Sequence, residues 1–199
     1  MVRVGVSVEG ATEERFIKMV LAPYLAAKQV YVIPISVGGG INLDRIRSEL
    51  KRMASSFSYV TTFYDFYGFQ GREVGETKAS LEEKIKQHTH SNVQAKLIPY
   101  VQMYEFEGLL FTSPEAIATH LNGDSLMSWA QAVLSQFDNN PETINDSIET
   151  APSKRLLQKT NYRKTTHGPN IAQEIGIEAL RDRCAGFNAW LVSLESLAQ

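Results

Sequence analysis

The chain has 199 residues, of which 43% are hydrophobic and 21% charged, and its net charge is -2. These totals exclude a disordered chain and suit one folded domain with a sizeable core. A single cysteine excludes an internal disulfide and fits a reducing cytoplasm. Because no apolar run approaches about 18 residues, we expect neither a signal peptide nor a membrane span.

Strand-like and helix-like segments alternate through the first half of the chain. Runs rich in β-branched residues predict strands at 2–8, 30–37, 58–64 and 96–104. Helical spacing of apolar residues predicts helices at 12–28, from 42 or 44 to about 53, and at 77–87. This alternation predicts a Rossmann-like α/β fold, with a parallel four-stranded sheet in the order 2-1-3-4 and helices on both faces.

The second half has the pattern of a helical region. We expect its helices at 106–111, 114–121, 125–137, 152–159, 170–184 and 188–197. Since no linker composition separates the halves, we interpret residues 1–199 as a single domain. Residues 1–111 would form the α/β sheet core, and residues 112–199 a helical extension packed on it.

Acidic side chains follow three of the predicted strands. Glu9 follows the first strand, Asp65 the third and Glu105 the fourth. Parallel strands end at one edge of the sheet, where open α/β sheets bind ligands, so we expect these carboxylates to converge. Carboxylate oxygens are the ligands that Mg²⁺ or Mn²⁺ prefers, and an unengaged carboxylate can act as a general acid or base. The alternative is ordinary solvation of strand ends.

Two further acids can join the same site. Glu13 lies four residues after Glu9, and Glu107 falls in the first helical turn after Glu105. We expect both to assist in holding metal. Glu13 could instead be a first-turn acid that interacts only with its helix dipole. If Glu105 and Glu107 both lay on a helix, only one of them would reach the site.

Lys and Arg are absent from residues 97 to 153 and then cluster between 154 and 167. Lys154 and Arg155 would open a helix capped by Thr150 or Ser153, and a helix start with two cations attracts phosphate. Arg163 and Lys164 follow Tyr162, an aromatic that can stack on a base. We therefore expect Lys154, Arg155, Arg163 and Lys164 to bind phosphate or nucleic acid. The alternative is a solvated basic surface.

Five motifs together resemble a bacterial family of unknown function, number 4276. They are Val8-Glu9-Gly10-x-Thr12-Glu13, Asp65-x-Tyr67-Gly68, Tyr104-Glu105-Phe106-Glu107, Ala151-Pro152-Ser153-Lys154-Arg155 and Cys184-x-x-Phe187-x-x-Trp190. That family is similar to Toprim domains, which occur in topoisomerases, primases and the OLD-type nucleases of phage defence. Its members are often linked to ATPase partners.

The resemblance implies a Toprim-like fold and roles for particular residues. Toprim proteins use a Glu after the first strand as acid/base, here Glu9, and an Asp-x-Asp that holds Mg²⁺, here Asp65 and Tyr67. Because Tyr67 replaces the second Asp, either Glu105 or Glu107 supplies the missing ligand or catalysis has been lost.

We interpret the chain as a cytoplasmic, metal-dependent phosphodiesterase or nuclease of Toprim type in phage defence, with nucleic acid as substrate and with its oligomeric state open. The alternatives are a non-catalytic partner of a defence ATPase and a hydrolase of small nucleotides or phosphates.

Overall fold

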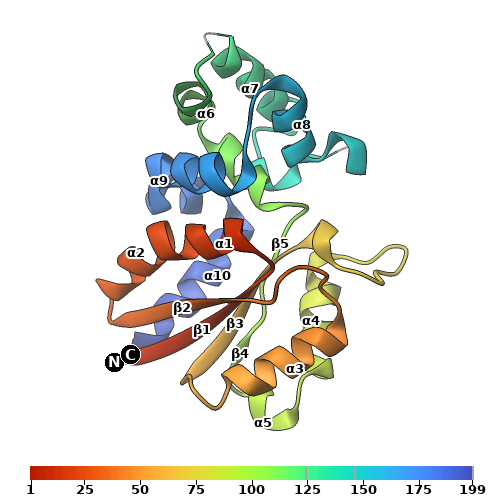
Figure 1. Cartoon of the computed structure of the whole chain (residues 1–199), viewed down its shortest axis with the longest axis vertical. Coiled ribbons are helices and arrows are strands. Elements are labelled where there is room, and N and C mark those ends of the chain that lie inside the picture. The colour runs from red at the N-terminus through yellow and green to blue at the C-terminus, as the bar shows by residue number, and fades with distance from the viewer. Residues whose placement is uncertain (124, 146, 199) are drawn as a thin grey trace.

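The computed structural model describes residues 1–123, 125–145 and 147–198. Its centre is a parallel sheet in the order β2-β1-β3-β4, with a fifth short strand, β5, also paired to β3 (Figure 1). The strands are β1 (Val2–Val8), β2 (Val30–Ser36), β3 (Tyr59–Asp65), β4 (Leu97–Ile98) and β5 (Val101–Gln102). The predicted parallel sheet and its strand order are confirmed.

The central strand β1 is buried from Val4 to Val8, as expected for a parallel strand covered on both sides. Its register fixes which residues meet at the carboxyl edge of the sheet. Val8 lies opposite Ser36 of β2 and opposite Phe63 of β3. The residues that follow these positions, Glu9 and Asp65 among them, therefore emerge at one edge.

The single strand expected at 96–104 is wrong, because the sheet is interrupted there. Pro99 separates β4 from β5 and has no N–H to donate to a ladder. The side chain of Thr62 spans the gap: its hydroxyl donates to Tyr100 O (2.7 Å) and accepts from Tyr100 N–H (2.8 Å). The chain therefore continues alongside β3 despite the interruption.

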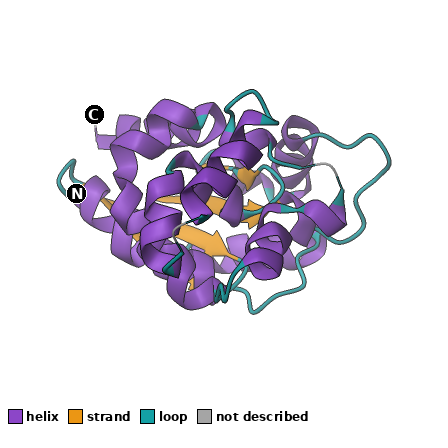
Figure 2. Ribbon diagram, turned by 90° about the horizontal axis from the view of Figure 1, so that it is seen from above, coloured by secondary structure: helices purple, strands orange, loops and turns teal. Residues whose placement is uncertain are grey.

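Helices cover both faces of the sheet, as expected, and Figure 2 shows the strands enclosed between them. One face carries α1 (Ala11–Phe16), α2 (Ala22–Ala26), α9 (Lys164–Arg183) and α10 (Ala185–Glu195), which share one buried cluster with β1. The other face carries α3 (Leu43–Met53), α4 (Lys78–His88) and α5 (Ser91–Gln94), which share a second cluster with Tyr64 and Val101.

Local chemistry explains several helix boundaries. Asn42 caps α3 by accepting a hydrogen bond from Arg45 N (2.9 Å), and Thr77 caps α4 by accepting one from Ser80 N (3.1 Å). The helix expected at 12–28 contains a π-helical turn at Ile17–Leu21. Pro23 lies just after this turn. Because proline has no backbone N–H, it cannot donate a hydrogen bond to the preceding turn, and the pattern of helical hydrogen bonds changes there.

The second half is mainly helical, as predicted. Its remaining α-helices are α6 (Pro114–Leu121), α7 (Leu126–Ser135) and α8 (Pro152–Lys159). The segment expected as a helix at 106–111 is a 3₁₀ helix, η3 (Phe106–Thr112), and shorter 3₁₀ turns occur at Phe66–Gly68, Pro141–Thr143, Ile148–Thr150 and Ser196–Ala198. Helix α9 begins at Lys164, not near residue 170, and is broken at Gly176, whose φ is 77°.

The last helix packs directly on the sheet. The Trp190 ring stacks on Tyr100 with centroids 4.7 Å apart, and its Nε1–H donates to Thr61 Oγ1 of β3 (2.8 Å). Cys184 is fully buried, as expected of a core residue.

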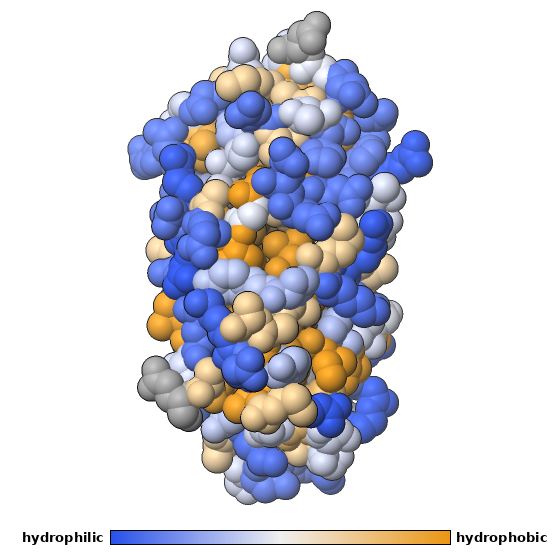
Figure 3. Space-filling view, turned by 90° about the vertical axis from the view of Figure 1, so that its left-hand side faces the viewer, coloured by the Kyte–Doolittle hydropathy of each residue, from blue (hydrophilic) through white to orange (hydrophobic). Residues whose placement is uncertain are grey.

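The face shown in Figure 3 is mostly hydrophilic, with apolar patches between the polar side chains. Among the helices of the described residues, none is both long enough and apolar enough to cross a bilayer.

Candidate functional site

The carboxyl edge of the sheet forms a cleft of about 430 Å³. Its charged lining consists of Glu9, Glu13, Asp65, Glu105, Lys154 and Lys164. Glu9 lies just beyond β1, Asp65 ends β3, and Glu105 immediately precedes η3. The cleft therefore lies between the ends of β1 and β3, where the strand order reverses and open α/β sheets bind ligands.

The Glu9 side chain lies directly over the backbone of Gly68. A β-carbon at Gly68 would collide with the Glu9 carboxylate, so this close approach requires glycine. Burial raises the pKa of Glu9, the nearby Glu13 raises it further, and Lys164 lowers it. No described residue donates a hydrogen bond to the Glu9 carboxylate, which leaves its oxygens available to a ligand.

Glu13 is 8% exposed and is fixed by the start of its own helix. Its Oε2 accepts a hydrogen bond from Gly10 N (3.0 Å), the backbone half of a capping box. Burial raises the pKa of Glu13 despite this bond and the positive charge of Lys164. Glu13 therefore stabilises the helix start and faces the cleft at the same time.

Asp65 joins the end of β3 to the start of η3. Its Oδ1 accepts a hydrogen bond from Phe106 N (2.8 Å). Burial raises the pKa of Asp65 well above its usual range, and the charges of four other acids, Glu13, Glu107, Glu105 and Glu9, raise it further. The five acids therefore lie close enough to repel one another, as convergence of the strand ends predicts.

Glu105 is bound at both oxygens by the first turn of α8. Ser153 donates its backbone N–H to Oε2 (2.8 Å) and its hydroxyl to Oε1 (2.9 Å). The expectation that Thr150 or Ser153 caps this helix is wrong, because Ala151 occupies the N-cap position and the Ser153 side chain turns to Glu105. This link places the start of α8, and Lys154 with it, beside the acids.

Glu107 lies beneath the cleft, with 1% of its surface exposed, and does not line the cleft. Its Oε1 accepts a hydrogen bond from Tyr162 Oη (3.3 Å) and lies 3.5 Å from Lys164 Nζ. Burial raises the pKa of Glu107 to about 7, although Lys164 opposes the shift. Tyr162 is 3% exposed, so the expectation that its ring stacks on a base is wrong.

Two of the four predicted cations reach the cleft. Lys164 lies 3.9 Å from Glu105 Oε1 as well as near Glu107. Burial acts to lower the pKa of Lys164, but the surrounding acids outweigh burial and the net shift is upward. Lys154 is exposed and lines the same cleft. The site therefore combines the acids with two lysines, and the surrounding acids stabilise the positive charge of Lys164.

The other two predicted cations do not line the cleft. Arg155 Nε donates to Thr150 O (2.7 Å), and its guanidinium lies 5.3 Å above the Phe137 ring. Arg163 is exposed at the start of α9, where its backbone N–H donates to His167 Nδ1 (3.1 Å). Arg155 therefore packs against the helical half, and Arg163 lies on the surface outside the cleft.

The acids of the cleft are the type of side chain that binds a divalent cation. Within the described ranges, no three His, Cys, Asp or Glu side chains are arranged as a metal site. The donor chemistry nevertheless fits, because the cleft offers hard carboxylate oxygens whose mutual repulsion a cation would relieve. The half-buried side chain of Glu9, whose carboxylate accepts no hydrogen bond from a described residue, can rotate towards a shared ion; Glu105 is already engaged by Ser153.

Sequence reasoning missed three residues that shape this region. Gly68 admits the Glu9 carboxylate, and Ser153 binds Glu105; only the fold brings these pairs together. Glu142 is one of the acids in residues 97–153, the segment without Lys or Arg, but it has a structural role. It accepts hydrogen bonds from Gly186 N (2.7 Å) and Phe187 N (3.0 Å) at the start of α10. Counting the acids of this segment therefore overstates the negative charge available in the cleft.

The sequence matches a family described as Domain of unknown function (DUF4276) over residues 8–195. The chain belongs to this family. No curated protein matches it. Among solved structures, the C-terminal region of the Xanthomonas campestris pv. campestris OLD protein, phased with platinum, is similar with a TM-score of 0.50 and 15% identity, over 99% of this chain and 94% of that one. The same region phased with mercury gives a TM-score of 0.49 and 14% identity, over 98% and 95%. The likeness to the platinum-phased structure shows that the DUF4276 chain shares the fold of that region, in agreement with the Toprim-like α/β fold expected from the sequence.

Proposed function

We propose that this protein is a metal-dependent phosphodiesterase of Toprim type that hydrolyses nucleic acid. The observation that supports this most is the meeting of four acids and two lysines in one cleft at the carboxyl edge of the sheet. Acids alone would repel a phosphodiester, whereas Lys154 and Lys164 attract it. The fold shared with the OLD region agrees with this proposal.

The roles of the acids follow from their surroundings. Glu9 combines carboxylate oxygens that accept no hydrogen bond from a described residue with a raised pKa, so it suits a general acid or base. Glu9 and Asp65 would hold Mg²⁺ or Mn²⁺, with Glu13 and Glu105 beside them. When bound, the cation would polarise a phosphate oxygen and offset charge that develops during hydrolysis.

Because Tyr67 stands where Toprim proteins have their second Asp, the site needs a substitute ligand. Glu105 lines the cleft, whereas Glu107 is buried beneath it and faces Tyr162 and Lys164. We therefore propose that Glu105 is the substitute metal ligand and that Glu107 orients the Lys164 side chain. Lys154 and Lys164 would bind the phosphate backbone from the side of the helical half.

The test is cleavage of plasmid DNA and of single-stranded DNA and RNA with Mg²⁺ or Mn²⁺. We expect Glu9→Gln to abolish cleavage, since the side chain keeps its size but loses its charge and its capacity to accept a proton. The matched control is Glu14→Gln, because Glu14 is the neighbouring acid of α1 and pairs with Lys18 instead. Equal activity of wild type and Glu9→Gln would remove Glu9 from the mechanism.

A non-catalytic partner of an ATPase is the second candidate. Two observations favour it: Tyr67 in place of a carboxylate, and the lack of a three-ligand metal arrangement among the described residues. Failure of the wild-type protein to bind Mn²⁺ by calorimetry would support this candidate. A role in phage defence and an ATPase partner form part of our proposal on the strength of the family resemblance. A cytoplasmic location forms part of it because the chain has a single cysteine.

A further inference from the structure

Two tyrosines stand at the edge of the cleft. Tyr67 lines the cleft, and its ring lies 5.4 Å from the ring of Tyr104, at an interplanar angle of 44°. Both side chains are partly exposed. Tyr67 N–H also donates to Tyr104 O (3.0 Å), so the backbones of the two segments are joined where the rings meet.

Tyr104 has a backbone conformation that tyrosine rarely adopts. Its φ is 58°, in the left-handed region that favours glycine or asparagine. A non-glycine residue in this region costs on the order of 1 kcal/mol or more, and such strain concentrates at functional sites. Here the turn places the Tyr104 ring against Tyr67 while the next residue, Glu105, enters the cleft.

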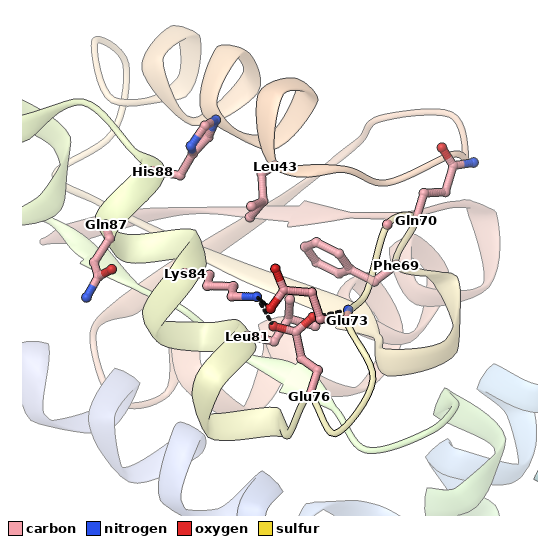
Figure 4. Close-up of a pocket in the computed structure, with 10 residues that line it drawn as sticks. Leu43, Phe69, Gln70, Glu73, Glu76, Leu81, Lys84, Gln87 and His88 are labelled. Carbon is pink, nitrogen blue, oxygen red and sulfur yellow. Dashed lines mark hydrogen bonds and ion pairs between the residues drawn. The ribbon is translucent and has the colours of Figure 1, made fainter.

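Arg72 extends the aromatic pair. Its guanidinium lies 4.4 Å from the centroid of Phe66 and 5.4 Å from that of Tyr67. Its Nε is buried and has no hydrogen-bond partner among the described residues. The loop that carries Arg72 is fastened by Lys84 of α4, which pairs with Glu73 (2.8 Å) and Glu76 (2.7 Å) in a separate hollow of the structure (Figure 4).

Another hollow, of about 510 Å³ and more apolar than the acidic cleft, opens beside Tyr104. Phe66, Met103 and Tyr104 form its apolar wall, and the opposite wall is the start of α4 with the residues before it: Glu76, Thr77, Lys78, Ala79 and Glu82. The aromatic pair therefore separates two spaces, since Tyr67 lines the acidic cleft and Tyr104 lines the apolar hollow. A ligand that spans both spaces can place a phosphate beside Lys154 and Lys164 and a flat apolar group against the aromatic side chains.

We propose that Tyr67 and Tyr104 seat an unpaired nucleobase next to the phosphate bound in the acidic cleft, and that the substrate is therefore single-stranded nucleic acid. This inference rests on the proposed function of the cleft. Every base offers a π-face to an aromatic ring, so stacking binds single strands with little regard to sequence. In a duplex the bases are already stacked and paired, and moving one into the hollow costs several kcal/mol.

Binding can be measured separately from hydrolysis in the Glu9→Gln variant. Three fluorescent ligands of one length serve as probes: a single-stranded oligonucleotide, the same strand with abasic sites at its central positions, and the blunt duplex. We expect the single strand to bind more tightly than the other two. Tyr104→Leu and Tyr67→Leu should each weaken single-strand binding by roughly 5- to 100-fold, with little change for the abasic strand.

Two controls separate stacking from folding. Tyr104→Phe and Tyr67→Phe keep the rings and should retain single-strand affinity. Tyr31→Leu removes a partly exposed tyrosine near the start of β2, far from the cleft, and should change nothing. Circular dichroism would confirm that each variant is folded.

The outcomes distinguish the two proposals. Equal binding of all three ligands, or an equal loss for all three in Tyr104→Leu, would overturn the base site and leave a phosphate-binding cleft intact. Preference for the duplex would overturn the single-strand assignment alone. If the protein binds none of the three ligands and also cleaves none, the proposed function itself fails.

Discussion

Gly68→Ala is the most informative single substitution, because it would move one carboxylate and little else. The new β-carbon would overlap the Glu9 carboxylate, to which its three nearest heavy atoms all belong. Gly68 does not have a positive φ, so alanine adds no backbone strain there. The overlap involves the far end of a flexible, half-buried side chain, which can rotate away.

The expected effects on stability and activity therefore differ. Because the carboxylate can rotate, the free energy of unfolding should change by less than about 1 kcal/mol. Restoring an ordinary contact distance requires a shift of the carboxylate by roughly 1 Å or more. A misplacement of about 1 Å at a reacting group can cost about 100-fold in rate. We expect kcat to fall by about that factor while the melting temperature stays nearly constant.

The assay is Mg²⁺-dependent cleavage of a labelled single strand, combined with thermal melting of the same preparations. Gly186→Ala is the matched control, since its β-carbon would lie 2.8 Å from Oε1 of another acid, Glu142. Glu142 is pinned by two backbone hydrogen bonds and cannot rotate freely. The control should lose about 1–3 kcal/mol of stability and keep its activity below its melting temperature.

Full activity in Gly68→Ala would refute the reasoning, because it would show that the position of the Glu9 carboxylate does not matter. A large loss of stability in Gly68→Ala would also contradict it. That result would mean that the Glu9 side chain is held rigidly by the fold.

Three further predictions concern charge, metal and core. Burial raises the pKa of Glu107 from 4.5 to about 7, so the folded state retains a proton that the unfolded chain releases, and stability should fall by up to about 3 kcal/mol as pH rises through this window. Melting curves of Glu107→Gln should lack that component. Tyr67→Asp creates the Asp-x-Asp expected of Toprim proteins, so calorimetry should show tighter Mn²⁺ binding, whereas the metal-free protein should melt lower because another acid joins the repelling group. Trp190→Ala should cost about 3–5 kcal/mol and preserve one cooperative urea transition; two transitions would mean that the helical half unfolds separately.

Much of the fold was predictable from periodicity. The order of the sheet followed from four alternations of strand and helix, and Asn42 and Thr77 cap their helices as turn chemistry predicts. The interruption at Pro99 was missed because the flanking residues are as apolar as those of a continuous strand. The side chain of Thr62 bridges this gap, and such a long-range bond has no local sequence signal.

The candidate site was predictable in part for the same reason. Parallel strands end at one edge, so Glu9, Asp65 and Glu105 could be brought together by topology alone. The cations could not be sorted in this way, because the direction of a side chain on α8 or α9 depends on how these helices pack. Arg155 turns to Phe137, and Tyr162, expected to stack on a base, is buried against Glu107.

The two ends of the chain have a practical consequence. Figure 1 shows the start of β1 and the end of the last helix side by side, at the amino end of the strands. The seven residues of β1 span about 23 Å between that end and Glu9. An affinity tag, a fluorophore or a surface tether attached at either terminus would thus sit on the far side of the molecule. Immobilised protein should remain accessible to long polymers, which suits single-molecule and biosensor measurements.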